Sequence, residues 1–386
     1  MRFKISSFFL FAVFLISLLW RLSIKSNEST LSAKSISENE KKPKFVYVEK
    51  PPLSQKIDKF FSRRYKRGLF NGTVLFSVHD TIIYENSFGL ADVRKKDSLK
   101  TSSAFQLASV SKTFTAYAIM LLKQRGKLSY SDSLRKFFPD FPYQNITIHQ
   151  LLIHRSGLPN YMYFSDKYWR NSKNRTIDNS DVIDLMIKYK PQPYYLPGRR
   201  YNYNNTNYAL LASIIQKVSH KTYPEFMKEE IFKPLEMNDT YVYDKNVDSI
   251  NFSEVKGYTS WRRKAENTYL NGVVGDKGIY STVEDLNKFS RALFEGTLVK
   301  LDELKNAYQL GHKELYDNDN YGYGWRINML PDSSKIVYHT GWWKGFRSYF
   351  IRSLKDDKTI VVLTNKSRTG VLHTKELMKL FDIKYE

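Results

Sequence analysis

The sequence has 386 residues, of which 42% are hydrophobic, and a formal net charge of +22, so its composition is that of a folded but strongly basic protein. It contains no cysteine, which excludes disulfides, thiolate zinc sites, iron–sulfur clusters and a cysteine nucleophile. The basic residues come in short scattered groups without a recognisable nucleic-acid-binding module, so we expect no nucleic-acid partner. Attraction to an anionic membrane surface fits this charge better.

The N-terminus holds a candidate membrane segment. Arg2 and Lys4 precede an apolar run from Ile5 to Trp20, after which charged residues resume. Such a run is typical of a secretory signal peptide or a short signal anchor, and its length is near the lower limit for spanning a bilayer. No small-x-small cleavage site follows closely, so we favour an uncleaved anchor at 1–22, with a cleaved signal peptide as the alternative. Both place the bulk of the protein outside the cytoplasm.

A polar segment at 23–53, rich in Ser, Lys and Glu, is typical of a flexible linker. A single folded domain is expected at 54–386, beginning with a helix at about 54–66. Two β-rich runs follow at 71–78 and 81–84. The short polar connection between them predicts a β-hairpin.

The strongest chemical signal is the pair Ser109 and Lys112, at the start of an apolar helix that ends near Gly126. One helical turn separates the two residues, so their side chains share a face and the lysine can take the proton of the serine. The helix N-terminus favours negative charge on the serine oxygen and disfavours the charged lysine. The same S-x-x-K spacing starts at Ser133 and Ser253, but neither opens a long helix. We therefore choose Ser109 as the nucleophile.

Beyond this helix the chain alternates helical stretches with turn clusters to about residue 320, and it then becomes rich in strands. The expected helices cover 180–189, 206–219, 224–232 and 283–294. The expected strands cover 321–328, 335–340, 346–353 and 359–363, and a final helix covers about 371–381. Strands at both chain ends predict an α+β fold, in which a mainly antiparallel sheet is flanked by helices and a large helical subdomain is inserted at about 116–320.

A second group is needed to pass a proton to the leaving group, and the candidate is Tyr203. It belongs to a Tyr-x-Asn triplet between the Pro197-Gly198 turn and the helix expected at 206–219. A loop held by a rigid helix is a suitable place to present a catalytic side chain. The triplet recurs elsewhere in the chain, so a packing role for this aromatic loop is the alternative.

The third candidate is His339-Thr340-Gly341, followed by Trp342, at the end of an expected strand. A glycine there lets the backbone approach a substrate closely, and a neighbouring N–H can stabilise an oxyanion. Taken alone, the triplet also fits an ordinary strand end with a turn.

Together and in this order, the three motifs resemble those of the serine β-lactamase and penicillin-binding protein superfamily. The match is to its class C β-lactamase-related branch, which includes D-Ala-D-Ala carboxypeptidases, D-amino-acid peptidases and esterases. Two further segments, LLIHRSGLP at 151–159 and GIYSTVEDL at 278–286, also resemble motifs of this superfamily. The resemblance covers roughly residues 55 to 380 and implies the β-lactamase/transpeptidase-like fold.

The resemblance implies an acyl-enzyme mechanism. Ser109 would attack a carbonyl group, Lys112 would accept the serine proton, and Tyr203 would serve as the acid/base partner. Asn205 would orient either the substrate or the lysine. The resemblance implies neither a metal nor another cofactor.

The substrate side would be formed by the third motif. Backbone N–H groups of Ser109 and Trp342 would make the oxyanion hole, while His339, Thr340 and Gly341 would line the substrate. Many superfamily members have lysine where this chain has His339. A histidine is only partly charged near neutrality, which weakens the case for recognition of a substrate carboxylate.

These observations predict an extracytoplasmic serine hydrolase that cleaves an ester or amide of a small molecule or peptide, with peptidoglycan-derived compounds among the options. The absence of G-x-S-x-G argues against an α/β-hydrolase. The competing hypothesis is a non-hydrolytic sensor that binds penicillin or peptidoglycan in the same pocket. Intact Ser109, Lys112 and Tyr203 favour the enzyme.

Overall fold

The computed structural model describes residues 52–169, 175–244, 255–260, 263–311, 320–368 and 371–384. The expected anchor at 1–22 lies outside these ranges, as do most of the linker expected at 23–53 and the alternative serine Ser253. In this part of the chain, no helix combines the length and the apolar character needed to cross a membrane.

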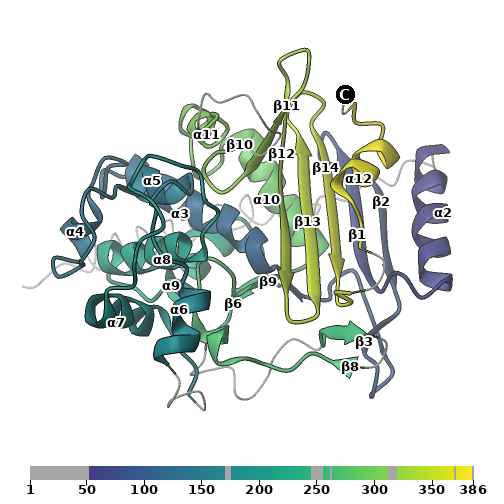
Figure 1. Cartoon of the computed structure of the whole chain (residues 1–386). Helices are drawn as coiled ribbons and strands as arrows, with labels where there is room; N and C mark the ends of the chain where they lie inside the picture. The colour runs from purple at the N-terminus through teal and green to yellow at the C-terminus, as the bar shows by residue number, and fades with distance from the viewer. Residues whose placement is uncertain are drawn as a thin grey trace, which may run out of the picture. The chain divides into compact units, whose positions relative to one another are not determined.

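A seven-stranded antiparallel sheet organises the protein (Figure 1). Its strand order is β10-β11-β12-β13-β14-β1-β2, so the first two strands of the chain extend a sheet made by the last five. The two groups join where β1 pairs antiparallel with β14, with Val74 opposite Val362. The strands are β1 (Gly72–Val78), β2 (Thr81–Phe88), β10 (Asn320–Tyr321), β11 (Arg326–Met329), β12 (Lys335–Trp343), β13 (Phe346–Ser353) and β14 (Lys358–Thr364). The prediction of a mainly antiparallel sheet built from both chain ends is confirmed.

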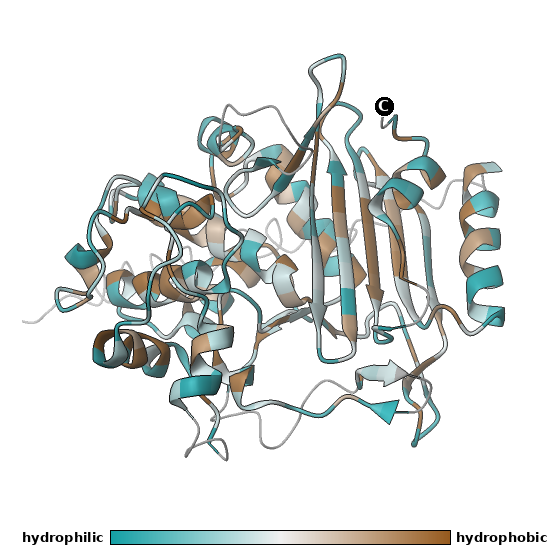
Figure 2. Ribbon diagram, viewed as in Figure 1, coloured by the Kyte–Doolittle hydropathy of each residue, from teal (hydrophilic) through white to brown (hydrophobic). Residues whose placement is uncertain are grey.

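Helices cover both faces of the sheet. Successive side chains of a strand point to opposite faces, and here the apolar side chains on each face pack into a separate core. In β1, Val74 and Phe76 belong to one buried core and Leu75 to the other. Helices α2 (Pro52–Lys66) and α12 (Thr374–Leu380) pack on the first face, and α10 (Val283–Glu295) packs on the second (Figure 1). The hydropathy colouring shows apolar residues along the central strands and polar residues on the outer side of α2 (Figure 2).

Helix α3 (Ser111–Gln124) lies beside the sheet, and helices α4 to α9 gather on its far side (Figure 1). The other helices are α4 (Leu134–Phe137), α5 (Ile148–Leu152), α6 (Tyr161–Tyr168), α7 (Asn179–Tyr189), α8 (Asn205–Ser219), α9 (Tyr223–Met227) and α11 (Leu301–Ala307), and a π-helical turn at Lys228–Phe232 continues α9. Short strands outside the large sheet are β3 (Leu90–Asp92), β4 (Asp97–Ser98), β5 (Phe105–Gln106), β6 (Tyr241–Val242), β7 (Tyr258–Ser260), β8 (Arg263–Lys264) and β9 (Ile279–Ser281). The helix expected at 224–232 is thus α-helical only in its first half. The boundaries expected for the domain at 54–386 and for its insert at about 116–320 stay a prediction.

The single strand expected at 321–328 is wrong, because the chain turns between β10 and β11. Gly324 makes this turn with a φ of +80°, a conformation that favours glycine. Its backbone approaches α3 so closely that an added Cβ would lie 2.8 Å from the carbonyl oxygen of Lys112. The turn therefore packs β11 against the start of α3, where the candidate catalytic lysine lies.

Candidate active site

Ser109 lies in a short 3₁₀ turn, Ala108–Val110, that runs directly into α3. The sequence predicted that the helix begins at Ser109, whereas the regular α-helix begins at Ser111. The preceding residue, Ala108, has a φ of +49°, a conformation that is costly for a residue other than glycine and that is found at functional turns. The turn lifts Ser109 out of the helix and still leaves it beside Lys112 in the first turn of α3.

Lys112 is buried and has three close polar neighbours. Its Nζ donates to Oδ1 of Asn205 and to the carbonyl oxygen of Asp276, both at 2.8 Å, and lies 3.2 Å from Oγ of Ser109. Burial lowers the pKa of Lys112 to about 7, although the charge of Asp276 acts to raise this pKa and that of Arg326 lowers it further. A neutral amine has two N–H groups and one lone pair. Two acceptors at 2.8 Å use the N–H groups, which leaves the lone pair for the hydroxyl of Ser109.

Tyr203 precedes α8 and reaches the other side of the nucleophile. Loss of water contact raises the pKa of Tyr203, and a hydrogen bond with Ser109 offsets only part of this rise, so the phenol keeps its proton near neutrality. The ring of His154 packs against that of Tyr203, with centroids 4.4 Å apart, and its Nδ1 accepts from the backbone N–H of Asn204 at 3.2 Å. The buried imidazole therefore holds the loop that presents Tyr203.

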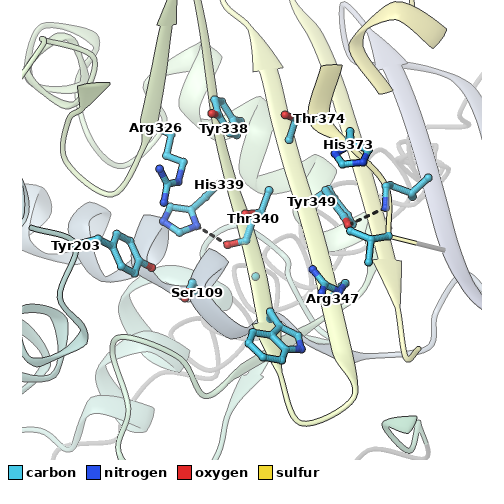
Figure 3. A pocket seen from close by; sticks show the side chains of 14 residues that line it. Ser109, Tyr203, Arg326, Tyr338, His339, Thr340, Arg347, Tyr349, His373 and Thr374 are labelled. Atoms are coloured by element: carbon cyan, nitrogen blue, oxygen red, sulfur yellow. Dashed lines mark hydrogen bonds between the residues drawn. The ribbon is translucent and has the colours of Figure 1, made fainter. Parts of the chain in front are cut away.

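His339 is buried and neutral. A carbonyl oxygen can only accept a hydrogen bond, so Nδ1 donates to the Thr340 oxygen at 2.8 Å (Figure 3). Nε2 then accepts from the Tyr321 hydroxyl at 3.0 Å. Burial holds the pKa of His339 well below its ordinary value, and the nearby charges of Lys112 and Arg326 add to this effect. The sequence predicted a partly charged histidine at this position. Burial and the nearby positive charges make the ring neutral instead.

A cavity of about 470 Å³ opens beside Ser109 and continues across β12. Ser109, Tyr203 and Arg326 lie on one side of this strand, and Arg347 and other residues lie on the side of β13 and α12 (Figure 3). The cavity is lined by Ser109, Tyr203, Arg326, Tyr338, His339, Thr340, Gly341, Trp342, Arg347, Tyr349, Val371, Leu372, His373 and Thr374. Among the residues that the structure describes, this lining contains two arginines and no carboxylate.

All eight predicted site residues lie at this place, in two layers. Six of them line the cavity, while Lys112 and Asn205 lie behind Ser109. Gly341 explains how β12 comes so close, because an added Cβ would lie 2.2 Å from the carbonyl oxygen of Leu107, next to the turn that holds Ser109. The roles of the eight residues stay predictions.

Several charged residues of the site were not predicted from the sequence. Arg326 stands between two buried apolar residues, Trp325 and Ile327, and a charge in such a strand was the available signal. Asp276 and Lys277 stand next to each other in an otherwise apolar and glycine-containing stretch, which gave a similar signal.

The competing serine Ser133 has a structural role. Its Oγ caps α4 by accepting from the backbone N–H of Arg135 at 3.3 Å. The lysine three residues later, Lys136, pairs instead with Asp132 at 2.9 Å. This S-x-x-K match is therefore a helix cap beside a surface ion pair.

Comparison with known proteins agrees with this geometry. Residues 57–383 match the family model described as Beta-lactamase. The chain is 36% identical over 310 residues to Penicillin-binding protein 4* of Bacillus subtilis (strain 168), over 77% of this chain and 68% of that protein. It is 29% identical over 328 residues to Protein flp of Staphylococcus aureus (strain MW2), over 81% of this chain and 63% of that protein, so it spans a little under two thirds of flp. Among solved structures, the octameric penicillin-binding protein homologue from Pyrococcus abyssi shares the fold, with a TM-score of 0.73 and 24% identity over 86% of this chain and 78% of that one.

The pKa of Lys112 predicts how reactivity depends on pH. Only neutral Lys112 can accept the proton of Ser109, so we expect the rate at which a fluorophosphonate labels Ser109 to rise with pH through about 7. A lysine with an ordinary pKa would place this rise near pH ~10. Time-resolved intact-mass measurement, from about two pH units below to two above that pKa, gives the rate. Lys112→Met should lower the rate by about 100-fold or more and abolish the rise. A wild-type rate that is flat through neutrality would contradict the assignment.

Proposed function

Because the chain belongs to the beta-lactamase family, whose members are serine hydrolases, we propose that it is an extracytoplasmic enzyme that cleaves an ester or amide through an acyl-enzyme on Ser109. The observation that carries this proposal is the position of the Ser109 hydroxyl, 3.2 Å from the amine of Lys112 and hydrogen-bonded to the phenol of Tyr203. A nucleophile next to a neutral base and a protonated acid is equipped for acyl transfer.

In the first half of the reaction, Oγ of Ser109 attacks the carbonyl carbon of the substrate while its proton passes to the lone pair of Lys112. Negative charge develops on the carbonyl oxygen, where the backbone N–H groups of Ser109 and Trp342 would stabilise it. The leaving group departs after it receives a proton through Tyr203, whose phenol is protonated near neutrality. The product of this half is the acyl-enzyme.

In the second half, water attacks the acyl carbon and loses its proton to the neutral amine of Lys112, and Lys112 returns this proton to Oγ of Ser109 as that oxygen leaves. Asn205 supports both halves by accepting one N–H of Lys112 at 2.8 Å, which keeps the lone pair directed at Ser109. Thr340 and Gly341 line the cavity next to the nucleophile, so the substrate would lie along this part of β12.

The cavity suits a substrate that carries negative charge. Burial makes His339 neutral, so the positive charge of the lining comes from Arg326 and Arg347, which lie on either side of β12 (Figure 3). The Nε of Arg347 donates to the carbonyl oxygen of Ser367 at 2.6 Å, and its guanidinium lies 5.6 Å from the centre of the Trp342 ring. These contacts fix the arginine beside an indole that is 64% exposed. We further propose that the substrate is an anionic ester or amide with an apolar part that contacts Trp342.

Replacement of the nucleophile tests the mechanism. Ser109→Ala should abolish the covalent adduct with a fluorophosphonate or a β-lactam and reduce ester hydrolysis to background, because the attacking oxygen is gone. Intact-mass analysis detects the adduct, and Ser133→Ala is the matched control because it removes the other S-x-x-K serine. Labelling of wild-type protein without turnover of any ester, D-amino peptide or β-lactam would favour the sensor. Labelling that persists in Ser109→Ala would overturn the mechanism.

Charge removal tests the substrate class. We compare kcat/KM for a phenyl ester of a dicarboxylic acid with kcat/KM for a neutral ester of the same length. Arg347→Gln should lower the ratio of the two values by about 10-fold, because a charge-assisted hydrogen bond of ~1.5 kcal/mol is lost for the anionic ester alone. Arg63→Gln removes an exposed arginine from α2 and should leave the ratio unchanged. An equal loss for both esters would rule out Arg347 as an anion contact.

We also propose that residues 1–22 anchor the enzyme on the outer side of a membrane, in keeping with the apolar run Ile5 to Trp20. The full chain should remain with membranes after a carbonate wash and should be digested by protease added to intact cells. A variant that lacks residues 2–22 should stay in the cytoplasm, because it has lost the export signal. Protection of the full chain from external protease would contradict the proposed location.

A further inference from the structure

A second buried lysine lies behind the catalytic one. Lys277 and its neighbour Asp276 follow Gly275 in the loop that leads to β9, and they are 4% and 2% exposed. Burial of a charged pair is costly unless its members satisfy each other and find further hydrogen bonds. Lys277 takes no part in the mechanism described above, so its burial needs another reason.

The contacts of Lys277 form a closed set. Its Nζ donates to the Tyr161 hydroxyl at 2.6 Å and to the carbonyl oxygen of Val273 at 2.9 Å, and it lies 3.5 Å from Oδ1 of Asp276. The Tyr161 hydroxyl in turn donates to Oδ2 of Asp276 at 2.8 Å. One cation and one phenol therefore hold both oxygens of this carboxylate.

Asp276 connects this set to the catalytic base. Its backbone carbonyl accepts from Lys112 at 2.8 Å, so the carboxylate of the same residue lies near the amine of Lys112. The negative charge of Asp276 acts to raise the pKa of Lys112, which opposes the effect of burial. Burial lowers the pKa of Lys277 to about 8, and Asp276 acts against this fall, so Lys277 is mostly protonated near neutrality.

The other groups around Lys112 do not compensate the carboxylate in the same way. The rings of Tyr203 and Tyr208 lie 5.0 and 5.7 Å from its Nζ, and burial raises the pKa of both phenols, so they stay neutral. Burial lowers the pKa of His154 and of His339 well below the ordinary value, so these rings carry no charge near neutrality.

Two cations remain, on different sides of the base. Arg326 on β11 lowers the pKa of Lys112 from the cavity side. Lys277 contacts Tyr161 of α6, and its Nζ lies 5.2 Å from the centre of the Trp343 ring. Among the described residues, Lys277 is the cation whose side chain contacts the carboxylate of Asp276. A base that must stay neutral needs a cation that offsets the charge of a carboxylate beside it.

We propose that Lys277 is a positioning residue that keeps Lys112 uncharged by neutralising the carboxylate of Asp276. The inference rests on the proposed role of Lys112 as the base. Without Lys277, the carboxylate would stabilise a proton on Lys112, and Ser109 would lose its acceptor. With Lys277 in place, the backbone carbonyl of Asp276 orients Lys112 while the charge of the same residue is compensated.

The rate at which a fluorophosphonate labels Ser109, measured against pH, tests the inference without knowledge of the substrate. Lys277→Met should move the midpoint of the rate curve upward by about one pH unit or more, because Lys112 then faces an uncompensated carboxylate. Asp276→Asn should move it downward, because the negative charge that acts to raise the pKa of Lys112 is lost. Lys277→Arg should restore most of the wild-type midpoint.

Lys123→Met is the matched control. Lys123 lies on α3, the same helix as Lys112, and it also pairs with a carboxylate, that of Glu303. The midpoint of this variant should equal that of wild type. If Lys277→Met does not fold, as judged by circular dichroism, Lys277→Gln takes its place, because it removes the charge and keeps a donor for the Tyr161 hydroxyl. Unshifted midpoints in the folded variants would overturn the role of Lys277 while leaving the proposed function intact. Absence of any label on wild-type Ser109 would overturn both.

Discussion

The proposed mechanism depends on one constraint, which is that the amine of Lys112 must be neutral while it lies in the protein interior. In water a lysine is protonated near neutrality, and the cost of burying its charge is what shifts the equilibrium. Burial alone would leave the N–H groups without partners, a state that also costs free energy. Asn205 and the backbone of Asp276 supply neutral acceptors, so the amine is satisfied without being protonated. In the proposed mechanism, the lone pair that remains accepts the proton of Ser109.

The long-range packing of the fold meets this constraint. The two acceptors lie 93 and 164 residues from Lys112 in the chain, on α8 and in the loop before β9. The strand that carries His339 reaches the nucleophile only because Gly341 lets its backbone pass close to Leu107. The sheet and the helices beside α3 must therefore both be in place before the proposed base has its acceptors, which is why the predicted site residues are spread over most of the domain.

Much of this arrangement could be predicted from local sequence patterns. Runs of β-favouring residues predicted the strands of the large sheet, except that β10 and β11 were expected as one strand, and helix context separated Ser109 from Ser133. The prediction failed where tertiary contacts decide. The turn at Gly324 depends on the approach of β11 to α3, and the neutrality of His339 depends on Tyr321 and on burial. Patterns in a sequence report which face a residue occupies, but they do not report which distant charges it will meet.

Recognition and catalysis meet at Arg326. Its guanidinium lines the cavity, and its charge also lowers the pKa of Lys112. Loss of this arginine would therefore change the strength of the base together with the affinity for an anion, and the two effects would be hard to separate. Arg347 lines the same cavity from the side of β13, and its fixed contacts are with Ser367 and Trp342. For this reason we expect Arg347 to report on the charge of the proposed substrate, whereas Arg326 also acts on Lys112, the proposed base.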